Sequence, residues 1–131
     1  MSAIRGISEI VLWAHDQDAM VRFYRDILGL SVISPPDRKN PIFLQAGPGQ
    51  EGIPQMIVVV KLPDDAPPFA SPRTLHHLAL ELSPDDFDRE RARLEGLGYE
   101  LRSGQHPVIP SRTMYLNDPE GNEVELICIS I

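Results

Sequence analysis

Two segments of the chain, residues 7–14 and 75–82, show the alternation of side chains that predicts half-buried strands. In the first segment Glu9 shares a face with the apolar residues Ile7, Val11 and Trp13. In the second segment His77 occupies the corresponding place, on the face opposite a row of leucines. Each segment therefore predicts a strand with one ionisable residue where an apolar residue is expected.

A helix is predicted after each of these strands. The first follows a capping aspartate, Asp16 or Asp18, and ends at Gly29. The second begins at a capping serine, Ser83, with proline next to it, and ends at Gly98. Residues at helical spacing predict the inner faces, which are Met20, Phe23, Tyr24, Ile27 and Leu28 in the first helix and Phe87, Arg91, Leu94 and Leu97 in the second.

Three shorter strands are predicted in the rest of each half. They cover residues 30–33, 41–46 and 55–62, and then 99–102, 112–116 and 123–129. The last two are joined by a turn over residues 117–122 that contains Asp, Pro, Gly and Asn. Both halves thus repeat a strand, a helix and three strands, which predicts an α+β fold made of two βαβββ modules. We predict one domain over residues 1–131, with module one at about 5–62, a proline-rich connector at about 63–73, and module two at about 74–131.

Composition narrows the class of protein. The chain has 131 residues, a net charge of −7 and no run of Lys or Arg, so a nucleic-acid partner is not expected. No apolar stretch has the length of a membrane span, and no secretory signal is visible at the start. The single cysteine, Cys128, excludes an internal disulfide. We therefore predict a cytoplasmic protein.

Three ionisable residues are candidates for a metal site. Glu9, His77 and Glu125 all lie on predicted strands, where a carboxylate is costly to bury unless it is paired or binds a metal. Two carboxylates and an imidazole that converge would form a facial metal site with open positions. The alternative is that each lies at an exposed rim or is neutralised by an arginine.

Three motifs resemble the vicinal oxygen chelate superfamily, which includes glyoxalase I, extradiol dioxygenases, fosfomycin-resistance enzymes and bleomycin-binding proteins. They are residues 23–30 (FYRDILGL), 75–80 (LHHLAL) and 118–126 (DPEGNEVEL). The resemblance implies paired βαβββ modules in a curved mixed sheet that cups a divalent metal, with the helices on its outer face. It also implies metal-ligand roles for His77 and Glu125, and places Glu9 where a first-strand ligand, most often histidine, is found. For the fourth ligand of glyoxalase I, Gln55 is the only oxygen donor nearby.

The second half also resembles the extradiol dioxygenase signature, in Gly104–His106, Met114–Tyr115, residues 118–121 and Glu125. This implies catalytic roles for Tyr115 and His106, in contact with the substrate and bound oxygen. The alternative is that Tyr115 is a core aromatic and His106 an exposed loop residue. Glu9 in place of histidine makes the site formally neutral, which favours Fe(II) or Mn(II), with Zn, Ni or Mg as alternatives. A departure is that residues 62–64 lack the additional histidine of those enzymes.

The resulting prediction is a metal-dependent enzyme that acts on a small oxygen-chelating substrate. Ring-cleaving oxygenation is the first reaction to consider, and a glyoxalase-like lyase or isomerase reaction is the second. Two further alternatives are a metal-free binding protein of the bleomycin-resistance kind and a structural or regulatory dimer whose pocket has lost its activity. Short members of the superfamily usually pair, so the resemblance also implies a homodimer.

Overall fold

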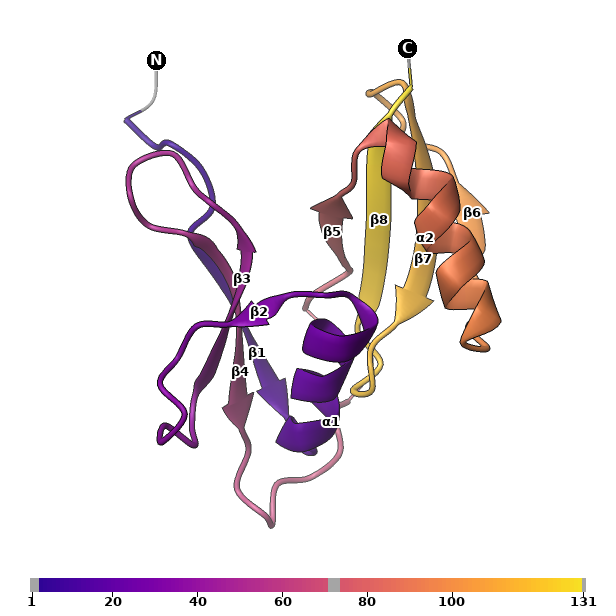
Figure 1. Ribbon diagram of the computed structural model, residues 1–131. Helices are drawn as coiled ribbons and strands as arrows, with labels where there is room; N and C mark the ends of the chain where they lie inside the picture. Colours follow the sequence, from indigo (N-terminus) through magenta and orange to yellow (C-terminus); the bar gives the residue numbers. More distant parts are fainter. Residues whose placement is uncertain (1–2, 71–73, 131) are drawn as a thin grey trace. The chain divides into compact units, whose positions relative to one another are not determined.

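The computed structural model describes residues 3–70 and 74–130 (Figure 1). The chain divides between Pro68 and Phe69 into two compact units, which we call unit 1 and unit 2. This boundary falls within the predicted connector at 63–73, of which residues 71–73 lie outside the described residues. Each unit holds one of the predicted modules.

Unit 1 contains a strand, a helix and three strands, in the order that the sequence predicts. Its elements are β1 (Glu9–Ala14), α1 (Gln17–Arg22), a π-helical turn η1 (Phe23–Ile27), β2 (Ser31–Val32), β3 (Ile42–Gly47) and β4 (Gln55–Lys61). The sheet order is β1-β4-β3-β2. The β1 and β4 strands are parallel and the other pairs are antiparallel, so the sheet is mixed.

The helix of unit 1 lies against one face of this sheet (Figure 1). It begins at Asp16, whose side chain accepts a hydrogen bond of 3.0 Å from the backbone N–H of Ala19. In β1, Leu12 and Ala14 are buried, whereas Val11 and Trp13 are exposed. The predicted alternation of β1 is therefore confirmed, and Glu9 belongs to the face that turns away from the helix.

Unit 2 repeats this arrangement. Its elements are β5 (Leu78–Glu81), α2 (Pro84–Gly96), β6 (Arg102–Gly104), β7 (Ser111–Asn117) and β8 (Glu123–Ile129). The sheet order is β5-β8-β7-β6, with β5 and β8 parallel and the other pairs antiparallel. Two mixed four-stranded sheets, each with its helix, confirm the predicted α+β class.

The α2 helix begins as predicted and ends one residue earlier than its apolar pattern suggests. The Ser83 side chain caps it by accepting from the backbone N–H of Asp86 at 3.2 Å. At the other end, the backbone N–H groups of Gly98 and Tyr99 donate to the carbonyl groups of Glu95 and Leu94. This pair of bonds is a Schellman motif, and the positive φ of Gly98, +94°, permits it.

Two predictions about this region were wrong as a result. Leu97 was expected on the inner face of the helix, but it is the C-terminal cap and is 53% exposed. A strand was expected over residues 99–102, but β6 starts only at Arg102. Tyr99 is held by the helix end, so the chain cannot join the sheet at that position.

The described residues include no helix that is both long enough and apolar enough to cross a membrane.

Candidate functional site

The register of unit 2 places one row of side chains across its sheet, on the face opposite α2. Ala79, Glu125, Tyr115 and Arg102 are direct neighbours in this row, on β5, β8, β7 and β6. On either side of Glu125, Val124 and Leu126 are buried on the other face, because side chains of a strand alternate. The row therefore brings together Glu125 and Tyr115, two of the predicted site residues.

Glu125 is a buried carboxylate with one partner. The residue is only 3% exposed, and its Oε1 lies 3.1 Å from Nε2 of His77. No hydrogen-bond partner reaches its Oε2, which is the one buried side-chain N or O atom without a partner in the described part of the chain. Buried polar atoms are almost always satisfied, so this oxygen is available to a ligand. A carboxylate and an imidazole that converge, with one carboxylate oxygen left without a partner, fit a divalent cation.

His77 lies just before β5 rather than within it. The predicted strand of 75–82 is shorter in the structure, because β5 pairs only with β8 and its ladder starts where Leu78 meets Val124. The His77 side chain is 34% exposed and its Nε2 faces Glu125, so the ring is only partly covered. A histidine that is partly exposed and contacts a buried carboxylate suits a metal-ligating residue, since the metal must reach it from solvent.

A tight turn fixes the register that sets Tyr115 opposite Glu125. The buried carboxylate of Asp118 accepts hydrogen bonds of 2.9 Å from the backbone N–H groups of Glu120 and Asn122. Gly121 completes the turn with a positive φ of +83°. The sequence predicted this turn, and its chemistry explains why β8 has the bounds that were expected.

Tyr115 lies close to both the histidine and the edge strand. Its ring centroid is 6.2 Å from that of His77, in an edge-to-face orientation. On the other side, a methyl group placed on Gly104 would lie 2.9 Å from Cε2 of the Tyr115 ring. The Tyr115 ring thus occupies space that a side chain at position 104 would fill, and glycine at this position leaves that space open.

Gly104→Ala is expected to lower the free energy of unfolding by about 1–3 kcal/mol, since an added methyl group in a filled position forces neighbouring atoms to shift. Urea unfolding measures this change. The matched control is Gly96→Ala in α2, where a methyl group meets no atom within 4 Å and the change should stabilise by up to about 1 kcal/mol. Equal stability of the two variants would show that Gly104 does not seat the Tyr115 ring.

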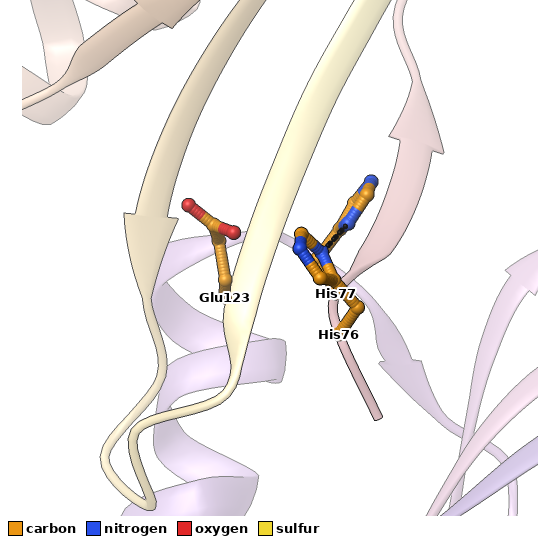
Figure 2. Close-up of side chains that lie close together, drawn as sticks. All are labelled: His76, His77 and Glu123. Atoms are coloured by element: carbon orange, nitrogen blue, oxygen red, sulfur yellow. Dashed lines mark hydrogen bonds between the residues drawn. The ribbon is translucent and has the colours of Figure 1, made fainter. Parts of the chain in front are cut away.

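A second cluster shares His77. Nδ1 of His76 and Nδ1 of His77 lie 2.7 Å apart, and Figure 2 shows the two rings beside Glu123. One ligand atom from each of these three residues lies within 4.8 Å of the others. Glu123 is also bonded to Arg102, whose guanidinium donates to Glu123 at 3.2 Å and to Asn117 at 2.9 Å.

No role for His76, Glu123 or Arg102 was predicted from the sequence. Glu123 stands two residues before Glu125, so strand alternation placed both carboxylates on one face and was the available signal. The contact with Arg102 joins residues 21 positions apart and depends on side-chain conformation, for which the sequence offers no signal.

Glu9 belongs to unit 1, where it is exposed at the start of β1 and paired in register with Met56 of β4. Met56 lines a shallow hollow of about 300 Å³ together with Ile33, Ser34, Pro35, Arg38 and Phe43. Gln55, the first residue of β4, is exposed and paired with Gly47. The ligand roles of Glu9 and Gln55 stay predictions.

His106 lies in the loop between β6 and β7 and is exposed. Its Nδ1 accepts hydrogen bonds from the backbone N–H groups of Val108 at 3.1 Å and Ile109 at 2.9 Å. The ring therefore stabilises its own loop, and only its Nε2 remains to bond a substrate or another group. Its predicted catalytic role stays a prediction.

The model of the Glyoxalase/Bleomycin resistance protein/Dioxygenase superfamily matches residues 6–126. A glyoxalase/dioxygenase of Nostoc punctiforme has a similar structure (TM-score 0.75), with 22% identity over 98% of this chain and 94% of that one. A lactoylglutathione lyase of Agrobacterium tumefaciens is 23% identical over 97% of this chain and 96% of that one, with a TM-score of 0.69. The genomically encoded fosfomycin resistance protein of Listeria monocytogenes is 20% identical over 98% of this chain and 96% of that one, with a TM-score of 0.67. No curated protein sequence matches significantly.

Proposed function

Because the chain belongs to the glyoxalase/bleomycin resistance protein/dioxygenase superfamily, we propose that it is a metal-dependent enzyme whose small-molecule substrate binds through two adjacent oxygen atoms. The observation that carries this proposal is the state of Glu125. Its carboxylate is buried, touches His77 through one oxygen and has no hydrogen-bond partner for the other. Burial of a carboxylate with an unpaired oxygen costs free energy when no metal is present. A bound cation would offset this cost, which explains why the residue is there.

His77 and Glu125 would hold the metal in unit 2, and the ligand role of Glu9 stays a prediction. Carboxylate and imidazole ligands suit Fe(II) or Mn(II), and Zn, Ni or Mg are the alternatives. When bound, such a cation supplies Lewis-acid stabilisation of negative charge on substrate oxygens, or a place for O2 to react. The homodimer and the cytoplasmic location expected from the sequence remain predictions beside this proposal.

Tyr115 would orient the substrate. It is half-buried, stands opposite Glu125 in the register, and lies beside His77. A phenol donates one hydrogen bond, so it can hold a substrate oxygen and stabilise charge that develops on it. Ring-cleaving oxygenation of a catechol is the first reaction that we propose, since a catecholate has two adjacent oxygens and this tyrosine matches the one in the dioxygenase signature.

A glyoxalase-like lyase or isomerase reaction is the second candidate, and the position of His106 favours it. Two backbone N–H groups already donate to Nδ1 of this histidine, which binds the ring into its own loop. The isomerase reaction does not need His106, whereas the dioxygenase signature assigns it a role at the substrate. Proton transfer next to a carbonyl would then be assisted by Tyr115 alone among the residues proposed as catalytic.

Elemental analysis of protein purified anaerobically and without chelators is the first test, and we expect about one Fe or Mn per chain. Oxygen uptake with a panel of catechols then separates the reactions, and Tyr115→Phe should lower turnover about 10²-fold while metal content is unchanged. Metal without oxygen uptake would favour the isomerase reaction. Protein that neither holds nor takes up metal would overturn the proposal and favour a binding protein, which protection of cells from bleomycin would reveal.

A further inference from the structure

Both ring nitrogens of His77 have partners in unit 2. On the inner side, Nε2 is 3.1 Å from Oε1 of Glu125. On the outer side, Nδ1 is 2.7 Å from Nδ1 of His76, and the two rings lie edge to face at a centroid distance of 5.0 Å. Figure 2 shows this second contact as a hydrogen bond between the two rings. The partners on the two sides together decide where the proton of His77 can be.

A contact of 2.7 Å between two nitrogens is a hydrogen bond, so one nitrogen must carry a proton and the other must offer a lone pair. A neutral imidazole has one of each, and the two are exchanged between its tautomers. If Nδ1 of His77 carries the proton, Nε2 has a free lone pair beside Glu125 and can bind a metal. If His76 donates instead, the proton of His77 is on Nε2, and that nitrogen cannot be a ligand.

We propose that His76 is a positioning residue that selects the tautomer of His77. In the metal-bound protein, Nδ1–H of His77 donates to Nδ1 of His76, which keeps its own proton on Nε2. In the metal-free protein the roles are reversed: Nε2–H of His77 donates to Glu125, and Nδ1–H of His76 donates to His77. The number of protons on the pair is the same in both states, because one proton passes between the Nδ1 atoms while solvent accepts one at His77 Nε2 and returns one at His76 Nε2.

This inference rests on the proposed function, since it assumes a metal on Nε2 of His77. Groups that orient a metal-bound histidine through its second nitrogen are usual, and their loss costs 10–100-fold in metal affinity. In this chain His76 is the partner found at that nitrogen. The competing possibility is that His76, His77 and Glu123 bind a metal directly, since their ligand atoms lie within 4.8 Å of one another.

The test measures Co²⁺ affinity and the visible Co²⁺ spectrum of the full chain and three variants. His76→Phe removes the acceptor and is expected to weaken Co²⁺ binding 10–100-fold with the same spectrum. His76→Asn keeps an amide oxygen near the position of Nδ1 and should restore most of the affinity. The control is His15→Phe, which replaces an exposed histidine of unit 1 bonded to the carbonyl of Pro67 and should leave the affinity unchanged.

A changed Co²⁺ spectrum in both His76 variants, with no rescue by asparagine, would overturn the proposal and make His76 a ligand. Unchanged affinity in His76→Phe would also overturn it, while the proposed function would stand. ¹⁵N NMR of the metal-free protein tests the proposal without any metal. It should show the Nε2–H tautomer of His77 in the native chain and a larger share of the Nδ1–H tautomer in His76→Phe, where Glu125 alone holds the proton on Nε2. If the native chain binds no metal, the proposed function fails, and this NMR comparison alone decides whether His76 sets the tautomer.

Discussion

Glu125→Gln is expected to weaken metal binding more than about 100-fold, since the loss of groups that merely orient a ligand already costs 10–100-fold. The amide has nearly the same shape as the carboxylate but carries no charge to attract a cation. Its neighbour His77 remains in place with an accessible ring. Calorimetric titration of the metal-free protein with Mn²⁺ measures the change in affinity.

The same position should show that function and stability oppose each other. In the metal-free protein, Oε2 of Glu125 is buried without a partner, and such a group costs about 1–3 kcal/mol. Glu125→Met fills a similar volume with no polar atom, so we expect the free energy of unfolding to rise by that amount in urea. If Glu125→Met were less stable than the native chain and still bound metal, both the expected loss of metal binding and the expected gain in stability would be contradicted.

Two carboxylates on the same face serve as controls for Glu125. Glu81→Gln changes an exposed residue of β5 and should leave Mn²⁺ binding unchanged. Glu123→Gln separates the two clusters that share His77, because Glu123 belongs only to the cluster with His76. Loss of metal in Glu123→Gln, but not in Glu125→Gln, would place the cation at the second cluster.

Much of this site follows from the sequence because two independent patterns agree. Strand alternation placed Glu125 on the face opposite the helix, and the turn over residues 117–122 fixed the pairing of β7 with β8. Together they set Tyr115 opposite Glu125 without knowledge of any other element. A carboxylate in an otherwise apolar strand breaks the local pattern, and such breaks are expected at functional positions.

The remaining features depend on contacts that a pattern of residue types does not contain. The bond between His76 and His77 depends on two ring orientations at the end of a strand, and the bonds of Arg102 depend on a long flexible side chain. In unit 1 the helix continues into a π-helical turn, where the N–H of Leu28 donates to the carbonyl of Phe23. Gly98 ends α2 as predicted, but Leu97 was wrongly placed on the inner face, because it fits the apolar spacing although it is already the C-terminal cap.

Phe87→Ala is expected to destabilise the protein by about 3–5 kcal/mol, which is a large share of the 5–15 kcal/mol typical of a whole domain. Phe87 is fully buried between α2 and its sheet. The guanidinium of Arg112 lies 4.5 Å from the centre of its ring and that of Arg91 lies 5.0 Å away. Arg112 is held there by Asp88, and this hydrogen bond keeps the pKa of Asp88 below its ordinary value. Truncation therefore leaves a cavity and removes the surface on which two cations rest.

Leu97→Ala is the matched control, because it truncates an apolar residue at the end of the same helix. The sequence pattern places Leu97 on the same inner face of the helix as Phe87, whereas the structure exposes 53% of Leu97. Urea unfolding should show a loss of less than about 1 kcal/mol for Leu97→Ala, in the range of ordinary surface substitutions. If both variants lost several kcal/mol, Leu97 would be part of the core, and the helix would continue beyond the Schellman motif. If neither did, the packing of α2 on the sheet would contribute little to the stability of unit 2, and the row that carries Glu125 would have to be held by strand pairing alone.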